Sequence, residues 1–116
     1  MTKAMSDRAS CQVVVAHQAS YPYSLKVKAG EQVTVSDKKE VGWVWCTTNG
    51  RGAWIPEKYL TQSQQIGTLL VDYDSTELTV TVGERLTRIR EESGWLWCSN
   101  QKGQKGWVPR AKTKTL

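Results

Sequence analysis

Short stretches in which apolar and polar residues alternate recur along the whole chain. The segments CQVVV (11–15), EQVTV (31–35), VWCTT (44–48) and AWIP (53–56) are rich in Val, Thr and Trp, and Gly, Asn and Lys turn signals separate them. Helical periodicity does not extend beyond one turn at PEKYL, residues 56–60. The pattern therefore predicts an all-β protein built from short strands.

The chain also repeats itself. GWVWC at 42–46 returns as GWLWC at 94–98, and SLKVKAGEQVTV at 24–35 matches ELTVTVGERLTR at 77–88. Self-similarity at a fixed spacing indicates a duplication, here with two copies of about 50 residues. A copy of that length is too short for a large sandwich, so a small closed or half-closed barrel is favoured.

Domain boundaries follow from the repeat. We expect domain 1 at residues 10–61 and domain 2 at residues 67–116. The join, TQSQQIG at 61–67, is polar. We interpret it as a flexible linker with a reach on the order of 12 Å, which would keep the two copies nearly in contact.

One turn fixes the register of each predicted hairpin. Asn49 and Gly50 form the strongest two-residue hairpin signal in the chain, since both residue types tolerate a positive φ. Counting outward from it predicts the pairs Trp45–Trp54, Trp43–Pro56 and Cys46–Ala53. A three-residue loop at 101–103 predicts the matching pairs Trp97–Trp107, Trp95–Pro109 and Cys98–Gly106.

The two faces of these hairpins differ in side-chain size. The small Cys–Ala and Cys–Gly pairs permit a second sheet to approach, which marks their face as the core and places the tryptophans outside. Trp45–Trp54 and Trp97–Trp107 then stiffen the hairpins as cross-strand pairs. Trp43 and Trp95 each face a proline, and such an exposed pair suits an extended proline-rich strand; the alternative is that each caps its own barrel.

Composition narrows the class of protein. The hydrophobic fraction of 39% and charged fraction of 23% are typical of a soluble globular protein, and no apolar run approaches the length of a membrane span. MTKAMSDRAS at the start has no secretory apolar region, and three cysteines suit neither a disulfide framework nor a zinc site. We therefore expect a cytoplasmic protein with no membrane partner. The net charge of +5 permits nucleic acid as a partner without indicating it.

Candidate catalytic chemistry is absent from the sequence. The sequence contains no Ser-His-Asp set and no phosphate-binding glycine loop, and His17 is the single histidine. We therefore predict that the protein is not an enzyme and takes no cofactor or metal, with His17 packed structurally rather than ligating a metal.

The order of motifs resembles the Src-homology-3 (SH3) domain. That family shows an ALYDY strand, an RT loop closing on EL, a KKGD turn, a WW strand and a final GYIPSNYV segment. Copy 2 follows this order with LLVDY (69–73), EL (77–78), TVGERL (81–86), GWLWC and GWVPRAK (106–112). Copy 1 follows it with VVVAH (13–17), SL (24–25), KAGEQV (28–33), GWVWC and AWIPEKYL (53–60). The resemblance, to tandem SH3 domains of a divergent, variant type, implies two five-stranded barrels that act as a non-catalytic peptide-binding adaptor or targeting module.

The family's groove residues can be carried over by position. In the family, the groove consists of both tyrosines of ALYDY, the first Trp of WW, and the Pro and Tyr of PSNY. Copy 1 keeps Trp43, Pro56 and Tyr59, with Val15 and His17 at the tyrosine positions. Copy 2 keeps Tyr73, Trp95 and Pro109, with Val71 and Lys112 at the remaining places. The resemblance thus implies two incomplete grooves.

The RT loops of the two copies differ in charge. QASYPYS in copy 1 has no acid, so either Tyr21 or Tyr23 leans over Trp43 as a substitute wall, or the loop packs onto its own barrel. In copy 2, carboxylates surround Trp95 and favour Arg- or Lys-bearing peptides, unless they are merely solvated loop charges. These residues are Asp74, Glu77, Glu91 and Glu92.

The leading hypothesis is a module, monomeric or weakly dimeric, that binds extended proline-rich or basic peptides through one or both grooves. The close tandem would raise effective concentration, or one copy would block the other's groove. The first alternative is a nucleic-acid-binding barrel pair that uses exposed Trp and a basic C-terminal end, although the carboxylates near Trp95 oppose it. That basic end comprises Lys102, Lys105, Arg110, Lys112 and Lys114. A second alternative is a structural dimerisation unit.

Overall fold

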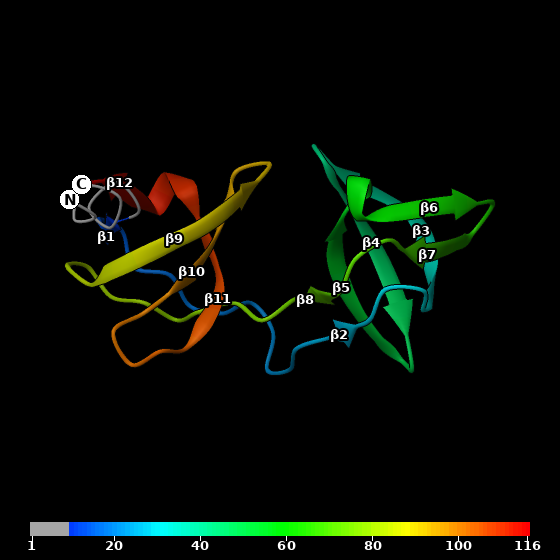
Figure 1. Ribbon diagram of the computed structural model, residues 1–116, viewed down its shortest axis with the longest axis horizontal. Coiled ribbons are helices and arrows are strands. Elements are labelled where there is room, and N and C mark those ends of the chain that lie inside the picture. Colours follow the sequence, from blue (N-terminus) through cyan, green and yellow to red (C-terminus); the bar gives the residue numbers. More distant parts are fainter. Residues whose placement is uncertain (1–9) are drawn as a thin grey trace, which may run out of the picture. The chain divides into compact units, whose positions relative to one another are not determined.

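The computed structural model describes residues 10–116, and these residues form an all-β fold (Figure 1). One five-stranded antiparallel sheet has the order β11-β10-β9-β1-β12. Its strands are β1 (Ser10–Val13), β9 (Arg85–Glu92), β10 (Trp95–Ser99), β11 (Lys105–Pro109) and β12 (Thr113–Thr115). The 3-10 helix η2 (Arg110–Lys112) connects its last two strands.

The second five-stranded sheet has the order β5-β4-β3-β7-β6. Its strands are β3 (Gln32–Glu40), β4 (Trp43–Thr48), β5 (Arg51–Pro56), β6 (Leu60–Ser63) and β7 (Ile66–Leu69). The 3-10 helix η1 (Glu57–Tyr59) follows β5, and the short strands β2 (Lys26–Val27) and β8 (Tyr73–Asp74) pair with each other. The prediction of an all-β fold with five-stranded sheets is confirmed.

The two repeats exchange their first strands. β1, the first strand of repeat 1, lies between β9 and β12 of repeat 2. In the same way β7, the first strand of repeat 2, lies between β3 and β6 of repeat 1. Figure 1 shows β1 in blue beside β9 in yellow, although more than half of the chain separates them in sequence.

The exchange defines two compact units that differ from the repeats. Among the described residues, unit 1 consists of 10–22 and 76–116, and unit 2 consists of 23–75. The boundaries expected from the sequence, 10–61 and 67–116, are therefore those of the repeats and not those of the folded units. The crossing points fall in the two RT segments, between Pro22 and Tyr23 and between Ser75 and Thr76.

The segment expected to be a flexible linker is instead a β-hairpin, so that expectation was wrong. β6 and β7 pair directly, with Leu60 opposite Leu69 and Ser63 opposite Ile66, and two glutamines form the turn. A two-residue turn folds its second strand back onto the first. Repeat 2 therefore gives its first strand to the sheet of repeat 1, and β1 fills the corresponding place in unit 1.

The predicted registers of the central hairpins are confirmed. Trp45 lies opposite Trp54, Trp43 opposite Pro56, and Cys46 opposite Ala53. Trp97 lies opposite Trp107, Trp95 opposite Pro109, and Cys98 opposite Gly106. Asn49 adopts a φ of 52° and Gly50 a φ of 77°, as the predicted turn requires.

Each core draws side chains from both repeats. The core of unit 1 joins Cys11 and Val13 of β1 to residues of repeat 2, namely Leu78, Val80, Leu86, Leu96, Cys98 and Val108. In unit 2, Leu69 of β7 is buried together with Val44, Cys46 and Ile55, the face expected to form the core. Trp107, expected on the outer face, is only 2% exposed, and residues 76–78 run alongside its strand through hydrogen bonds to its backbone. The exchanged strands are therefore integral parts of both hydrophobic cores.

Candidate functional site

Strand exchange regroups the predicted groove residues. Trp43, Pro56 and Tyr59 of repeat 1 share unit 2 with Tyr73 and Val71 of repeat 2. Trp95, Pro109 and Lys112 of repeat 2 share unit 1 with Val15 and His17 of repeat 1. The expected grouping by repeat is wrong, because the ALYDY-like strands belong to the opposite units. The exchange places Tyr73 beside Tyr59 in unit 2 and His17 beside Lys112 in unit 1.

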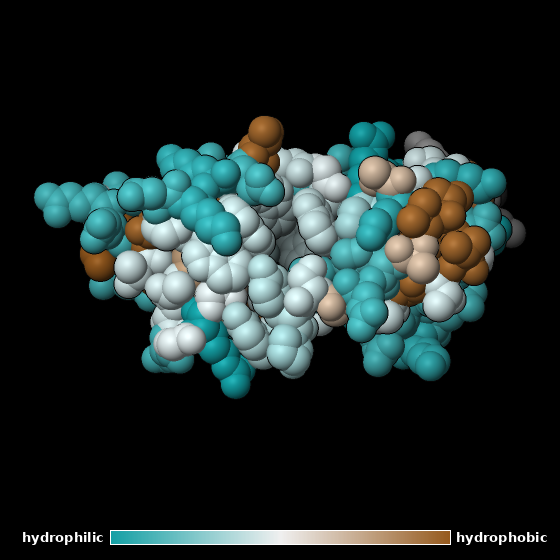
Figure 2. Space-filling model, turned by 180° about the vertical axis from the view of Figure 1, so that it is seen from behind, coloured by the Kyte–Doolittle hydropathy of each residue, from teal (hydrophilic) through white to brown (hydrophobic). Residues whose placement is uncertain are grey.

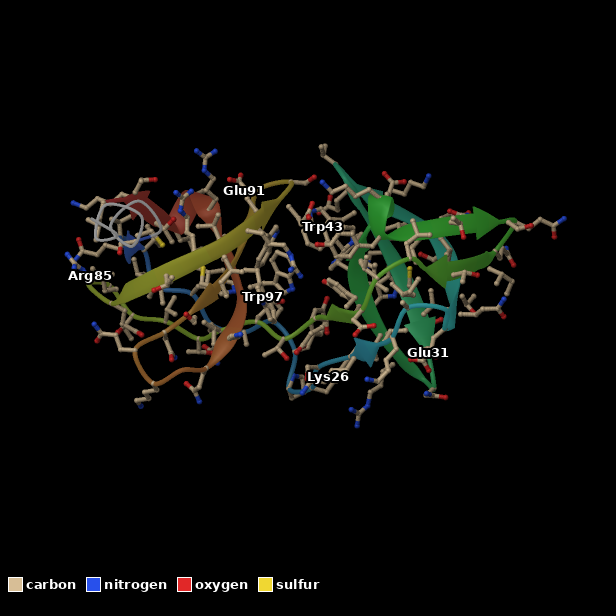
Figure 3. All side chains as sticks on the ribbon, viewed as in Figure 1. Lys26, Glu31, Trp43, Arg85, Glu91 and Trp97 are labelled. Carbon is tan, nitrogen blue, oxygen red and sulfur yellow. The ribbon has the colours of Figure 1, made fainter. Side chains whose placement is uncertain are left out.

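The site of unit 2 is an aromatic cluster. The rings of Tyr59 and Tyr73 meet edge to face, with centroids 5.7 Å apart, and the Tyr73 hydroxyl donates to the carbonyl oxygen of Trp54 at 2.8 Å. Trp43, at the start of β4 (Figure 3), is 7% exposed, Tyr59 8% and Tyr73 4%. Pro56 is fully buried. The expected exposed Trp–Pro platform is therefore wrong for this unit, in which the whole cluster is covered.

The two tyrosines of the first RT segment are divided by the crossing point. Tyr21 belongs to unit 1 and is 38% exposed. Tyr23 belongs to unit 2, where its hydroxyl donates to the carbonyl oxygen of Gly52 at 2.9 Å and the Arg51 guanidinium lies 5.0 Å from its ring centroid. Of the two interpretations of YPY, packing of the loop onto its own barrel describes Tyr23. The absence of a side chain at Gly52 has a steric reason, because a Cβ at this position would overlap the indole of Trp45.

The site of unit 1 is a chain of hydrogen bonds beside an indole. Glu77 Oε1 lies 2.9 Å from His17 Nε2 and accepts from the Ser20 hydroxyl at 2.9 Å and the Ser20 backbone N–H at 3.1 Å. Lys112 Nζ lies 3.0 Å from His17 Nδ1. The His17 ring meets Trp95 edge-on, with centroids 5.6 Å apart and planes at 80°.

The hydrogen-bond chain fixes the protonation of His17. A lysine ammonium can only donate, so His17 Nδ1 accepts from Lys112. Nε2 then carries the proton and donates it to Glu77, which makes the imidazole neutral. His17 is 8% exposed, and its backbone bonds to Val80 in both directions. The histidine is held by the fold and in turn holds the edge of Trp95, in keeping with the prediction of structural packing.

The four predicted carboxylates differ in their placement relative to Trp95, and Glu92 lies directly opposite Trp95 in the pairing of β9 with β10. Asp74 lies in unit 2, on β8, and Glu77 is occupied by His17 and Ser20. Glu91, near the end of β9 (Figure 3), lies 3.7 Å from a guanidinium nitrogen of Arg110. Glu92 is 7% exposed. The expected acidic surround of the indole is therefore only partly present: Glu92 lies beside Trp95 and Glu77 is next to it through His17, whereas Glu91 pairs with Arg110 and Asp74 folds with unit 2.

The surface around Trp95 is more open than its counterpart in unit 2. Trp95, Pro109 and Lys112 are partly exposed, and Val15 is 50% exposed. The backbone N–H of Val15 donates to the carbonyl oxygen of Lys112 at 3.2 Å, which fixes the two residues next to each other. Unit 1 also exposes aliphatic side chains, among them Val14, Val15 and Val82, and Figure 2 shows strongly apolar residues at the surface on the right of that view. We call Trp95, Pro109, Lys112 and Val15 the Trp95 surface.

The described residues were also compared with the requirements of metal, thiol and membrane sites. Within 10–116, no group of three or more His, Cys, Asp or Glu side chains could hold a metal ion. The three cysteines are buried and free, and burial raises the pKa of the Cys46 thiol to about 11. Over the described part of the chain, none of the helices has the length and apolar character needed to traverse a bilayer.

Comparison with known proteins yields one family. The family model of the variant SH3 domain matches twice, at residues 10–62 and 70–114. No curated protein and no solved structure matches the chain significantly. Both matched ranges follow the sequence repeats, so each contains strands that fold into different units.

Proposed function

Because the chain belongs to the variant SH3 domain family, we propose that it is a non-catalytic module that binds an extended peptide on the Trp95 surface. Members of this family generally mediate protein–protein interactions and are not catalysts. The observation that carries the proposal is the difference in burial between the two Trp–Pro pairs. Trp95 and Pro109 remain partly exposed, whereas Trp43 and Pro56 are covered.

The chemistry of the Trp95 surface suits a proline-rich strand. An indole across from a proline presents a flat apolar area, and a polyproline II helix offers prolyl rings and carbonyl groups that make no internal hydrogen bonds. The His17 ring packs on Trp95 with its plane at 80° to the indole, which restricts the orientation of the indole. A ring that is already fixed loses little conformational entropy when a ligand binds, so the site is prepared for weak but specific recognition.

Unit 2 takes a different part in this proposal. It contains the fuller set of family groove residues, namely Trp43, Pro56, Tyr59 and Tyr73, but these side chains are covered. A ligand would reach them only after their cover moves. We therefore assign the first binding event to unit 1 and treat unit 2 as a second, aromatic groove that needs opening.

Substitution of matched tryptophans tests the assignment. Proline-rich peptides selected on an array are titrated into the ¹⁵N-labelled protein, and the indole N–H signals of the six tryptophans are followed. Trp95→Ala is expected to weaken binding by about thirtyfold, since loss of a central aromatic contact costs about 2 kcal/mol. Trp43→Ala, the equivalent change in unit 2, should destabilise unit 2 but leave the affinity of the Trp95 surface unchanged, because the two tryptophans belong to different units.

Two results would contradict the proposal. Loss of binding in Trp43→Ala with full binding in Trp95→Ala would transfer the site to unit 2. Binding of a single-stranded oligonucleotide, strongly weakened by salt and without any response to peptides, would favour the nucleic-acid alternative.

A further inference from the structure

We infer that the Trp95 surface selects peptides that carry a carboxylate, which pairs with Lys112. This inference rests on the proposed function and specifies its ligand. The sequence favours the opposite preference, for basic peptides, because it places four acids near Trp95. In the structure Glu77 is bonded to His17 and Ser20, Glu92 is buried opposite Trp95, and the Lys112 side chain is partly exposed at the site.

The Lys112 ammonium has a hydrogen-bond partner but no compensating charge in that partner. Within residues 10–116 its polar contact is with His17 Nδ1, at 3.0 Å. Because this imidazole is neutral, the contact uses one ammonium proton without compensating the charge. Lys112 is partly exposed, so two further N–H donors remain available to a ligand.

The carboxylate of Glu77 is separated from Lys112 by the His17 ring. Glu77 lies on the other side of the imidazole, at Nε2, and the same carboxylate oxygen already receives the two Ser20 donors. The carboxylate therefore orients His17 and does not form an ion pair with Lys112. Of the other acids expected near Trp95, Glu92 lies opposite Trp95 and is 7% exposed, Glu91 has Arg110 as its partner, and Asp74 belongs to the other unit.

The two units differ in the residues at this position. Lys112 ends η2, and Tyr59 ends η1 at the corresponding position of unit 2. There the neighbouring residue is Tyr73 on β8, where unit 1 has His17. The uncharged pair of phenols in unit 2 and the imidazole–ammonium pair in unit 1 give the two sites different ligand chemistry. A carboxylate at Lys112 would form a charge-assisted hydrogen bond next to the apolar contact with Trp95.

The experiment uses peptides that differ only in charge. The probes are capped nonapeptides of proline in which one Glu, Gln or Lys occupies each position in turn. Dissociation constants are measured at low salt from the Trp95 indole signal. The best Glu peptide is expected to bind about fivefold more tightly than its Gln counterpart, the value for an ion pair worth about 1 kcal/mol.

Two variants of Lys112 and one control variant test whether the preference for the Glu peptide depends on Lys112. Lys112→Gln should abolish the preference for Glu over Gln, and Lys112→Arg should retain it. Lys114→Gln removes the same charge from the exposed strand β12 and should leave the preference unchanged.

The failure of this inference differs from failure of the proposed function. Equal affinity for the Glu and Gln peptides, or tighter binding of the Lys peptide, with a clear response at Trp95 would overturn the inference alone. Absence of any response at Trp95 to all peptides would overturn the proposed function as well. Loss of the Glu preference in Lys114→Gln would show that net charge, and not the site, causes it.

Discussion

The exchange of first strands predicts which unit each core residue stabilises. Leu69 belongs to repeat 2 by sequence, but its side chain is buried in unit 2 with 2% exposure. Val13 belongs to repeat 1 and is fully buried in unit 1. Leu69→Ala should therefore destabilise the unit formed mainly by repeat 1, and Val13→Ala the unit formed mainly by repeat 2.

The size of each effect follows from burial. Truncating a fully buried leucine to alanine costs about 3 kcal/mol, from lost transfer free energy and the cavity that remains. Truncating a buried valine removes two methyl groups and costs about 2 kcal/mol. At 1.4 kcal/mol per factor of ten, Leu69→Ala should lower the amide-exchange protection of its unit by about two orders of magnitude.

Native-state hydrogen exchange measures the loss of amide protection for each strand separately. In Leu69→Ala, exchange should accelerate in β3, β4 and β5 and remain at its original rate in β9, β10 and β11. Val13→Ala should give the reverse pattern. Three tryptophans lie in each unit, so the six indole signals provide an independent report on which unit opens.

The opposite pattern would refute the exchange. If Leu69→Ala accelerates exchange in β9–β11 and spares β3–β5, each repeat folds around its own first strand. The proposed composition of both sites would then be wrong, because Tyr73 would no longer share a unit with Tyr59, nor His17 with Lys112.

Two further predictions concern unit 2. Gly52→Ala should lower the free energy of unfolding by about 1–3 kcal/mol in thermal or chemical denaturation, because the new methyl group overlaps the indole of Trp45; an unchanged midpoint would mean that the indole relocates without cost. Burial raises the pKa of Cys46 from 9.0 to about 11, so the stability that its neutral thiol contributes is complete below pH 9 and is lost as the pH rises toward 11. The stability of the wild type should thus fall relative to that of Cys46→Ala over this interval, and parallel pH profiles of the two proteins would contradict the assignment.

Local sequence rules predict much of the fold. The Asn49–Gly50 turn sets the register of its hairpin, and the small residue opposite each cysteine identifies the core face. Both predictions depend on neighbours that a short hairpin brings together, so no information about the rest of the chain is needed. This is why the registers are correct in both repeats.

Partner choice between strands is not predictable in this way. β1 and β7 both present small or aliphatic residues to a core, and alternation shows only that one face is buried, not against which sheet. The decisive feature was the turn between β6 and β7. Gln64 adopts a φ of 55° there, a conformation more typical of Gly or Asn, so QQ gave no turn signal and the segment was interpreted as a linker.

The site predictions failed for the same reason. The site predictions treat the residues of one RT segment as members of one site because they are adjacent in sequence. The crossing points separate Tyr21 from Tyr23 and Asp74 from Glu77. Position-by-position transfer names candidate groove residues within each repeat, but it cannot identify which residues of the other repeat lie beside them.

The exchanged arrangement pairs side chains that suit each other. If each repeat kept its own first strand, His17 would lie beside Tyr59, and Tyr73 would lie beside Lys112. In the exchanged arrangement Tyr73 packs edge to face on Tyr59, and His17 accepts a hydrogen bond from Lys112 while it donates to Glu77. The Tyr73 ring therefore packs on another aromatic ring, and the Lys112 ammonium has the imidazole as its acceptor. Without the exchange, the ammonium would lie against a phenol ring and the imidazole would lack its carboxylate partner. Agreement between the short β6–β7 turn and these side-chain pairs, which depend on different residues, supports the exchange as a property of this sequence and links the topology directly to the different ligand chemistry of the two sites.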